Sequence, residues 1–262
     1  MRQIGIALFA FVLAASTSFA HYNMLLPDKP WANKGDKVTF TYQFGHPFEH
    51  EVFDAPEPKA VIVILPDDKT QKIEKFTKLS VPGADGKKVT AFSFVYEPAM
   101  RGDHTVVLQT PPFWMEESKE YWQDTVKVVL HVQTQKNWDA FLPPKLLGNQ
   151  LRMTPETRPY GLWPGMIFQA SVWWGREVPQ PRTEIEIERY NAQPVKAPPP
   201  DELITFKTRT DPNGVFTFAF PDPGWWCMTA GYQEIGRGWV AAGKKGPLRE
   251  RTTLWVHVDE KK

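Results

Sequence analysis

The sequence predicts an all-β protein built from two sandwich-like domains. Three observations carry this prediction. Segments that alternate apolar and polar residues recur along the chain, with turn-forming residues between them. The 25 Pro, 17 Phe and 11 Trp among 262 residues suit short strands joined by many turns. No convincing amphipathic helix separates the alternating segments of the first half, which favours an antiparallel sandwich.

The first half of the chain contains five predicted strands. Residues 37–44 and 88–96 alternate polar and apolar side chains, as half-buried strands do. Residues 60–65 are a short apolar run that ends at a Pro-Asp-Asp turn, and residues 104–109 follow an Arg-Gly-Asp turn. The fifth strand, residues 125–134, is rich in valine.

The second half repeats this β pattern. Residues 183–190 alternate strictly, and Asp211-Pro212-Asn213-Gly214 is a strong turn signal. The strands predicted here cover residues 166–174, 183–190, 204–210, 215–220, 224–230 and 252–258. Between the halves, residues 136–164 are Pro-rich and lack periodicity. We therefore expect an N-terminal domain over residues 21–135, a crossover over 136–164 and a C-terminal domain over 165–262.

The N-terminus is typical of an exported protein. A charged start is followed by an apolar run over residues 4–15 and a small-x-Ala site that ends at Ala20. We therefore expect a signal peptide over residues 1–20 and a periplasmic mature chain. Its single cysteine, Cys227, cannot form an internal disulfide, which fits that compartment. No second long apolar run follows, so no membrane anchor is expected in the mature chain.

Composition and motifs narrow the function classes. A formal net charge of +1 argues against nucleic acid as a partner. The sequence has no Gly-x-Ser-x-Gly elbow, no His-Glu-x-x-His motif and no glycine-rich phosphate loop. We therefore expect a protein that binds rather than one that catalyses.

Cleavage after Ala20 would make His21 the first residue of the mature chain. A terminal histidine carries an α-amine and an imidazole, which can chelate one metal ion together when both are deprotonated. The amine has an unperturbed pKa of about 8, so such a chelate is feasible near neutral pH. The alternative is that His21 follows the cleavage site without any role.

A second group of metal-ligand types follows a predicted strand. The segment from His46 to Asp54 holds two imidazoles, from His46 and His50, and the carboxylates of Glu49, Glu51 and Asp54. Imidazole and carboxylate suit divalent nickel, cobalt, zinc or copper ions. A solvated polar loop is the alternative interpretation of this segment.

Three more histidines lie in predicted strands or beside turns. His104 and His131 are candidate ligands, although hydrogen-bonded structural roles are the commoner reading of such positions. His257, in the last strand, is interpreted as structural.

Several segments resemble the periplasmic components of cobalt/nickel ABC-type uptake systems, a family related to the nickel-uptake substrate-specific region. The resemblance covers most of the mature chain and rests on an ordered series of segments: residues 20–27, 44–49, 157–165, 210–218 and 223–226. It implies an immunoglobulin-like sandwich followed by a transthyretin-like or collagen-adhesin-repeat-like domain. It also implies a role in binding or uptake of a transition metal.

Carried over by position, His21, His46 and Glu49 match the distinctive residues of that family. His131 falls in a strand where similar members also carry histidine, whereas His50 departs from the pattern. The leading hypothesis is a non-catalytic periplasmic protein that binds nickel or cobalt, with zinc or copper as alternative ions. His21 and His46 would hold the ion, with His131 or His104 completing the set and Glu49 or Glu51 nearby. A membrane metal permease is the partner that the resemblance implies.

Two other classes stay open. A copper-dependent oxidative enzyme of the polysaccharide monooxygenase type would also use an N-terminal histidine chelate on an all-β scaffold. A carbohydrate- or protein-binding β module, in which the histidines are incidental, is the other.

Overall fold

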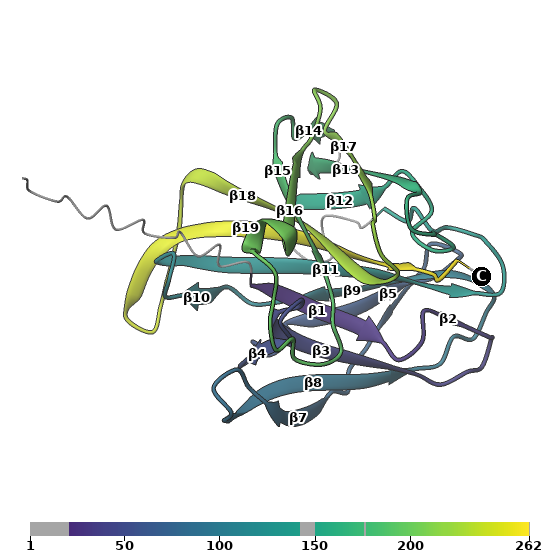
Figure 1. Ribbon diagram of the computed structural model, residues 1–262, viewed down its shortest axis with the longest axis horizontal. Coiled ribbons are helices and arrows are strands. Elements are labelled where there is room, and N and C mark those ends of the chain that lie inside the picture. Colours follow the sequence, from purple (N-terminus) through teal and green to yellow (C-terminus); the bar gives the residue numbers. More distant parts are fainter. Residues whose placement is uncertain (1–20, 142–149, 176, 262) are drawn as a thin grey trace, which may run out of the picture.

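The chain folds into three β-sheets stacked in layers (Figure 1). The computed structural model describes residues 21–141, 150–175 and 177–261. The described residues contain one short 3₁₀ helix, η1 (Asp201–Leu203), and no α-helix. The all-β, sandwich-like class expected from the sequence is therefore confirmed. The predicted signal peptide, residues 1–20, lies outside the described residues.

The first layer, sheet A, is antiparallel and has the strand order β1-β3-β8-β7. The short strand β4 pairs with the last three residues of β3. It comprises β1 (Tyr22–Pro27), β3 (Val38–His46), β4 (Glu51–Phe53), β7 (Thr77–Pro82) and β8 (Lys88–Tyr96).

The middle layer, sheet B, has the order β16-β15-β18-β19-β11-β9-β5-β6, and the short strands β2 and β10 also pair with β11. It comprises β2 (Trp31–Ala32), β5 (Ala60–Ile64), β6 (Thr70–Lys72), β9 (Gly102–Gln109), β10 (Phe113–Met115), β11 (Glu120–Val132), β15 (Glu184–Arg189), β16 (Thr205–Arg209), β18 (Gly224–Ala241) and β19 (Lys244–Val258).

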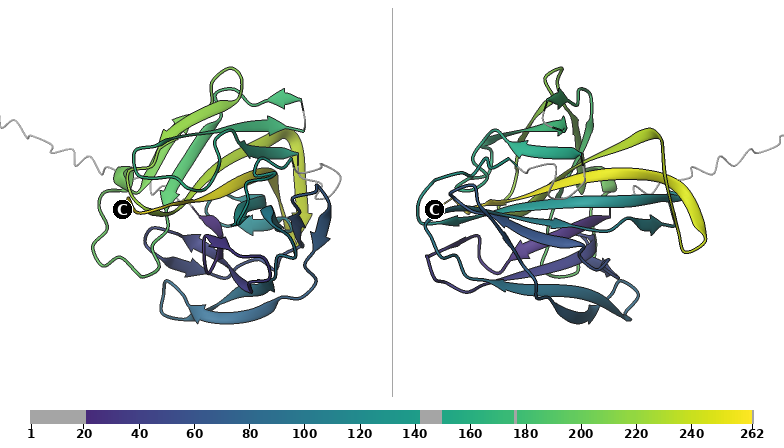
Figure 2. Two further views of the ribbon diagram at one scale, coloured as in Figure 1. Left: turned by 90° about the vertical axis from the view of Figure 1, so that its right-hand side faces the viewer. Right: turned by 180° about the vertical axis from the view of Figure 1, so that it is seen from behind.

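The third layer, sheet C, covers the other face of the middle sheet (Figure 2). In it β13 pairs with β12, β14 and β17. It comprises β12 (Leu151–Pro155), β13 (Ile167–Trp174), β14 (Val178–Pro179) and β17 (Val215–Ala219).

Two hydrophobic cores lie on opposite faces of sheet B. Phe40 and Val128 belong to the core shared with sheet A, and Phe168 belongs to the core shared with sheet C. Successive residues of a strand point to opposite faces, so one long strand can serve both cores. On β19, Trp255 enters the first core, whereas Leu254 and Val256 enter the second.

Sheet B joins the two halves of the sequence. β11 from the first half pairs in parallel with β19 from the second, from Tyr121 opposite Leu248 to Val128 opposite Trp255. The strand β12 also lies within the segment that was expected to be an aperiodic crossover. The halves therefore share a central sheet, and residues of the second half enter both cores.

No helix among the described residues is long and apolar enough to cross a membrane.

Candidate functional site

His21 and His46 lie side by side at one end of sheet A. Strands β1 and β3 pair from Tyr22 opposite Gly45, and one more step outward brings His21 opposite His46. Their ring centroids are 4.5 Å apart, with the ring planes tilted by 45°. Antiparallel pairing thus brings together two imidazoles that are 25 positions apart in the sequence.

Glu51 extends this row on the next strand. β4 pairs with β3 so that His46 lies opposite Glu51. Residues directly opposite each other in neighbouring strands point to the same face of the sheet. His21, His46 and Glu51 therefore form a row across three strands. Glu51 and not Glu49 is the carboxylate of this row, because Glu49 falls in the turn between β3 and β4.

Aromatic side chains surround the row. The His21 ring stacks on Phe44 at 5.6 Å and lies 5.0 Å from the ring of Phe53. The His21 cavity, of about 500 Å³, opens beside these rings, and only 6% of His21 is exposed. Its lining residues are His21, Phe44, His46, Glu51, Phe53, Trp114, Met115, Glu116 and Glu117. Glu116 and Glu117 could not be predicted from the sequence pattern as neighbours of His21, because they follow β10 in the other sheet.

Arg251 of β19 fixes the backbone of His21. Its guanidinium donates a hydrogen bond of 2.6 Å to the His21 carbonyl and lies 3.9 Å from the ring centroid of Trp122. It also forms a 3.3 Å ion pair with Asp124, which accepts a hydrogen bond from the amide of Asn23. Burial raises the pKa of the Asp124 carboxyl, and the charge of Arg251 opposes that rise. The C-terminal strand therefore positions the start of β1.

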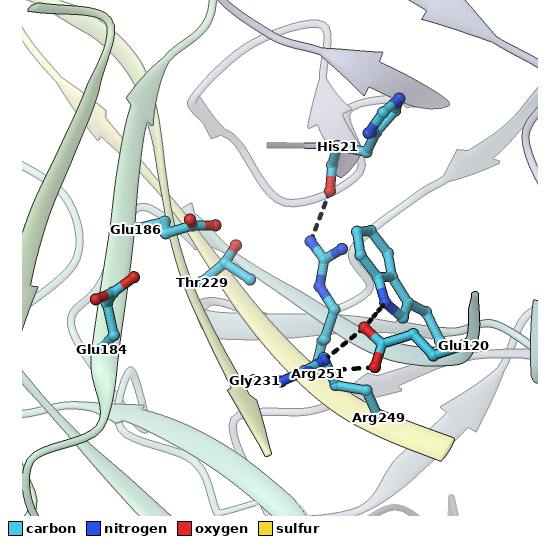
Figure 3. Close-up of a pocket in the computed structure, with 9 residues that line it drawn as sticks. His21, Glu120, Glu184, Glu186, Thr229, Gly231, Arg249 and Arg251 are labelled. Atoms are coloured by element: carbon cyan, nitrogen blue, oxygen red, sulfur yellow. Dashed lines mark hydrogen bonds and ion pairs between the residues drawn. The ribbon is translucent and has the colours of Figure 1, made fainter. Parts of the chain in front are cut away.

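A second cavity, of about 300 Å³, also reaches His21 (Figure 3). Arg251 enters it from sheet B, and the carboxylates of Glu184 and Glu186 lie across it on β15 (Figure 3). Arg249 forms a 2.7 Å ion pair with Glu120 at its edge. His21 therefore lies between two cavities, one lined by aromatic rings and the other by charged side chains.

Glu49 and His50 turn away from this row. One carboxylate oxygen of Glu49 is buried without a hydrogen-bond partner, and its charge contributes to the raised pKa of Glu188. His50 has a backbone φ of 57°, and its Nδ1 lies 2.8 Å from the carbonyl of Asn191. The turn thus directs both side chains toward the second half of the chain.

His104 is a structural histidine. It is wholly buried, with Nδ1 2.8 Å from the Tyr96 hydroxyl and Nε2 3.0 Å from the Met100 carbonyl. Both ring nitrogens are engaged, so neither is left for a metal ion. Burial lowers the pKa of His104. The expectation that His104 completes a metal site with His21 does not fit this placement.

His131 lies at the other end of β11. The His21 ring contacts Trp122 near the start of that strand, with centroids 6.5 Å apart. Nine further residues at roughly 3.3 Å each place His131 about 30 Å away. One ion cannot bind both His21 and His131 at that separation. Of the six predicted ligands, the structure brings together His21 and His46 only.

The side chains alone do not make a complete metal centre. Across the described ranges, no group of three or more His, Cys, Asp or Glu side chains is placed to hold one ion. An ion at His21 and His46 therefore needs a further donor. After processing, His21 itself would supply one, its free α-amine.

The fold and this site define a layered all-β protein with a histidine pair at the start of its first strand. The chain belongs to the family described as Domain of unknown function (DUF4198), whose model matches residues 18–234. None of the curated proteins matches the chain.

Solved structures show low similarity. A DUF4785 family protein from Legionella pneumophila is 11% identical, with a TM-score of 0.32, and the match covers 82% of this chain and 54% of that one. Salmonella alpha-2-macroglobulin reacted with methylamine is 12% identical, with a TM-score of 0.28, and covers 92% of this chain and 15% of its own. The chain therefore spans about half of the first protein and a small part of the second. Similarity at this level indicates nothing about activity.

Proposed function

We propose that the processed protein binds a divalent transition metal ion in the periplasm, in association with nickel or cobalt uptake. The α-amine and imidazole of His21 and the imidazole of His46 would hold the ion. The ion is the cargo of a non-catalytic protein, and a membrane metal permease is its proposed partner.

The contact between His21 and His46 carries this proposal. Metal–nitrogen bonds to histidine are about 2.0–2.1 Å long, so two nitrogens on one ion lie at most about 4 Å apart. Ring centroids 4.5 Å apart are compatible with a nitrogen–nitrogen distance in this range. The carboxylate of Glu51, the next residue in the row, adds negative charge beside the ion. The His21 cavity supplies a route of entry.

The chemistry of the donors also ranks the ions. Nitrogen donors bind divalent ions in the order cobalt, nickel, copper, with zinc below copper. Affinity alone would therefore favour copper, and specificity for nickel or cobalt would depend on the ion that the compartment supplies. The family resemblance, not the donor set, supports nickel or cobalt as the cargo.

Isothermal titration with nickel, cobalt, zinc and copper on the mature protein tests the proposal, after mass spectrometry has verified His21 as the terminus. We expect a tight site that weakens at least tenfold in a variant with a methionine before His21, and likewise in His46→Ala. His50→Asn is the matched control, because asparagine tolerates the positive φ of 57° and His50 lies outside the row. Unchanged affinity in the methionine-extended variant would refute the chelate.

The same donors also fit a copper-dependent oxidative enzyme. The position of His21 disfavours that candidate, because the residue is buried and its ring packs against Phe44 and Phe53, which would hinder a polysaccharide from reaching the ion. Incubation with copper, a reductant and chitin or cellulose distinguishes the two. Oxidised oligosaccharides would replace the binding function with an enzymatic one.

A further inference from the structure

Lys127 is a buried cation on the face of sheet B that packs against sheet C. It follows Thr125 by two positions on β11, so both side chains point to the same face of the sheet. Only 3% of Lys127 is exposed. Within the described ranges, no hydrogen bond or ion pair of its ammonium group is recorded. A buried charge without a partner is costly, so this position calls for a counter-charge.

Arg152 brings a second positive charge to the same place. It lies on β12, is 3% exposed, and its guanidinium is 5.6 Å from the ring centroid of Phe141. Burial is the main cause that lowers the pKa of Lys127 to about 7, with the positive charge of Arg152 contributing. No carboxylate of the described residues offsets these two effects. The ammonium form is therefore present near neutral pH beside another cation.

Two threonine hydroxyls next to Lys127 lack hydrogen-bond partners. Thr125 of β11 lies directly opposite Thr252 of β19 in the parallel register, and neighbouring strands are about 4.8 Å apart. Thr252 shares its face with Leu254, which enters the core between sheets B and C. The two threonines are 3% and 1% exposed, and in the described structure neither Oγ1 atom has a partner. Buried hydroxyls are normally satisfied, so these two indicate a bound species beside them.

A small cavity joins these groups. This Lys127 cavity has a volume of about 10 Å³ and is lined by Thr125, Lys127, Arg152 and Thr252, with three further residues of β12. None of its lining residues is acidic. A cavity of this size holds one water molecule or one ion of similar size. Water would satisfy the hydroxyls but would add no negative charge beside Lys127.

We propose that the Lys127 cavity binds one monatomic anion, with chloride as its ligand. The ammonium of Lys127 and the charge of Arg152 attract the ion, and the hydroxyls of Thr125 and Thr252 donate hydrogen bonds to it. Oxyanions such as sulfate and phosphate are too large for the cavity. Because the site lies in the core between sheets B and C, the bound ion stabilises the contact of β12 with sheet B. The proposal is independent of metal binding at His21.

Urea unfolding of the mature protein tests the site, with sodium gluconate replaced stepwise by sodium chloride at constant pH and ionic strength. An ion that binds only the folded state lowers the equilibrium constant of unfolding. We expect at least a fivefold decrease between about 1 and 100 mM chloride. Lys127→Met should abolish this chloride dependence. Lys78→Met, at an exposed lysine of β7, is the matched control and should retain it, so that general salt effects cancel.

Diffraction provides a second measurement that needs no variant to fold. Crystals of the parent protein grown in sodium chloride are measured at long wavelength, where chloride, unlike water, has an anomalous signal. We expect an anomalous peak in the cavity, within hydrogen-bonding distance of Thr125 and Thr252. A cavity that holds density without an anomalous peak would overturn the proposal, because its occupant would be water. An equal chloride dependence in the folded Lys127→Met variant would overturn it as well.

Discussion

Glu188 is a buried carboxyl that holds the turn after His46 against the second half of the chain. Its two oxygens accept hydrogen bonds from the Phe48 amide at 3.0 Å and the Thr205 hydroxyl at 2.9 Å. Burial is the main cause that raises the pKa of Glu188 to about 8, with the nearby charges of Glu49 and Glu186 contributing and the two hydrogen bonds opposing the rise. The residue is therefore protonated near neutral pH and ionises only at a cost in stability.

Glu188 makes the stability of the protein depend on pH. The folded pKa of about 8 lies above the ordinary value of 4.5. Between pH 4.5 and pH 8, the folded state therefore keeps a proton on Glu188 that the unfolded state has lost. The stabilisation by Glu188 is therefore complete below about pH 4.5 and declines as the pH rises toward 8. Glu188→Gln keeps the shape and cannot ionise. Across pH 5–8 it should gain stability over the parent by up to about 1.4 kcal/mol per pH unit, measured by urea unfolding. Parallel pH profiles for the two proteins would contradict this.

At the scale of elements, the β3–β4 hairpin places Glu51 beside His46 through an unusually close approach of two backbones. Gly45 has a φ of 152°, and a Cβ at this position would lie 1.9 Å from the Glu51 carbonyl oxygen. Only glycine fits there without moving β4. The glycine before His46 is thus a structural requirement of the row His21, His46 and Glu51.

Gly45→Ala should therefore lower the free energy of unfolding by about 2 kcal/mol or more. It should also weaken metal binding, because a displaced β4 moves Glu51. Gly35→Ala is the control: its φ of 84° is also unfavourable for alanine, but the new Cβ meets no atom within 4 Å. Urea unfolding compares the two variants. Equal losses would show that conformational strain, not the contact with Glu51, sets the requirement.

At the scale of the whole molecule, the continuous middle sheet makes the two halves dependent on each other. Cys227 and Trp255 from the second half are part of the core between sheets A and B. The indole of Trp255 also donates a 3.0 Å hydrogen bond to the carbonyl of Asn23. Without β19, β11 would lose the partner strand along most of its length.

Residues 21–135 alone should therefore not form a stable domain, although the sequence pattern suggests one. An unpaired edge on β11 and a core without Trp255 both cost stability. Circular dichroism and urea unfolding of this fragment measure the effect against the intact chain. A cooperative unfolding transition in the isolated fragment would contradict the prediction.

Strands were predictable where the pattern is local. Residues 88–96 were expected as a strand and form β8 with those bounds, because period-2 alternation needs no distant partner. The expected strand at 224–230 is only the first part of β18, which continues to Ala241. Its glycine-rich continuation lacks alternation and is held by pairing with β19. Pairing between distant segments leaves no comparable local pattern.

The residues of the candidate site were likewise predictable only in part. The sequence indicated His21 and His46 through a cleavage motif and a cluster of ligand types, and the structure places the two rings together. It could not choose between Glu49 and Glu51, because strand register decides which of them lies opposite His46. Nor could it separate His104, with both nitrogens engaged inside the protein, from His131, whose Nδ1 contacts Asp103.

By itself, the sequence determined the all-β class, most strand positions and the two histidines that carry the proposed function. These follow from local alternation, turn residues and residue chemistry. Only the tertiary structure decided which candidates share a site. Antiparallel register brings His21 to His46, whereas the length of β11 separates His21 from His131 by about 30 Å. The parallel pairing of β11 with β19 likewise joins the two halves of the chain, because contacts between strands more than a hundred residues apart arise only when the sheet forms.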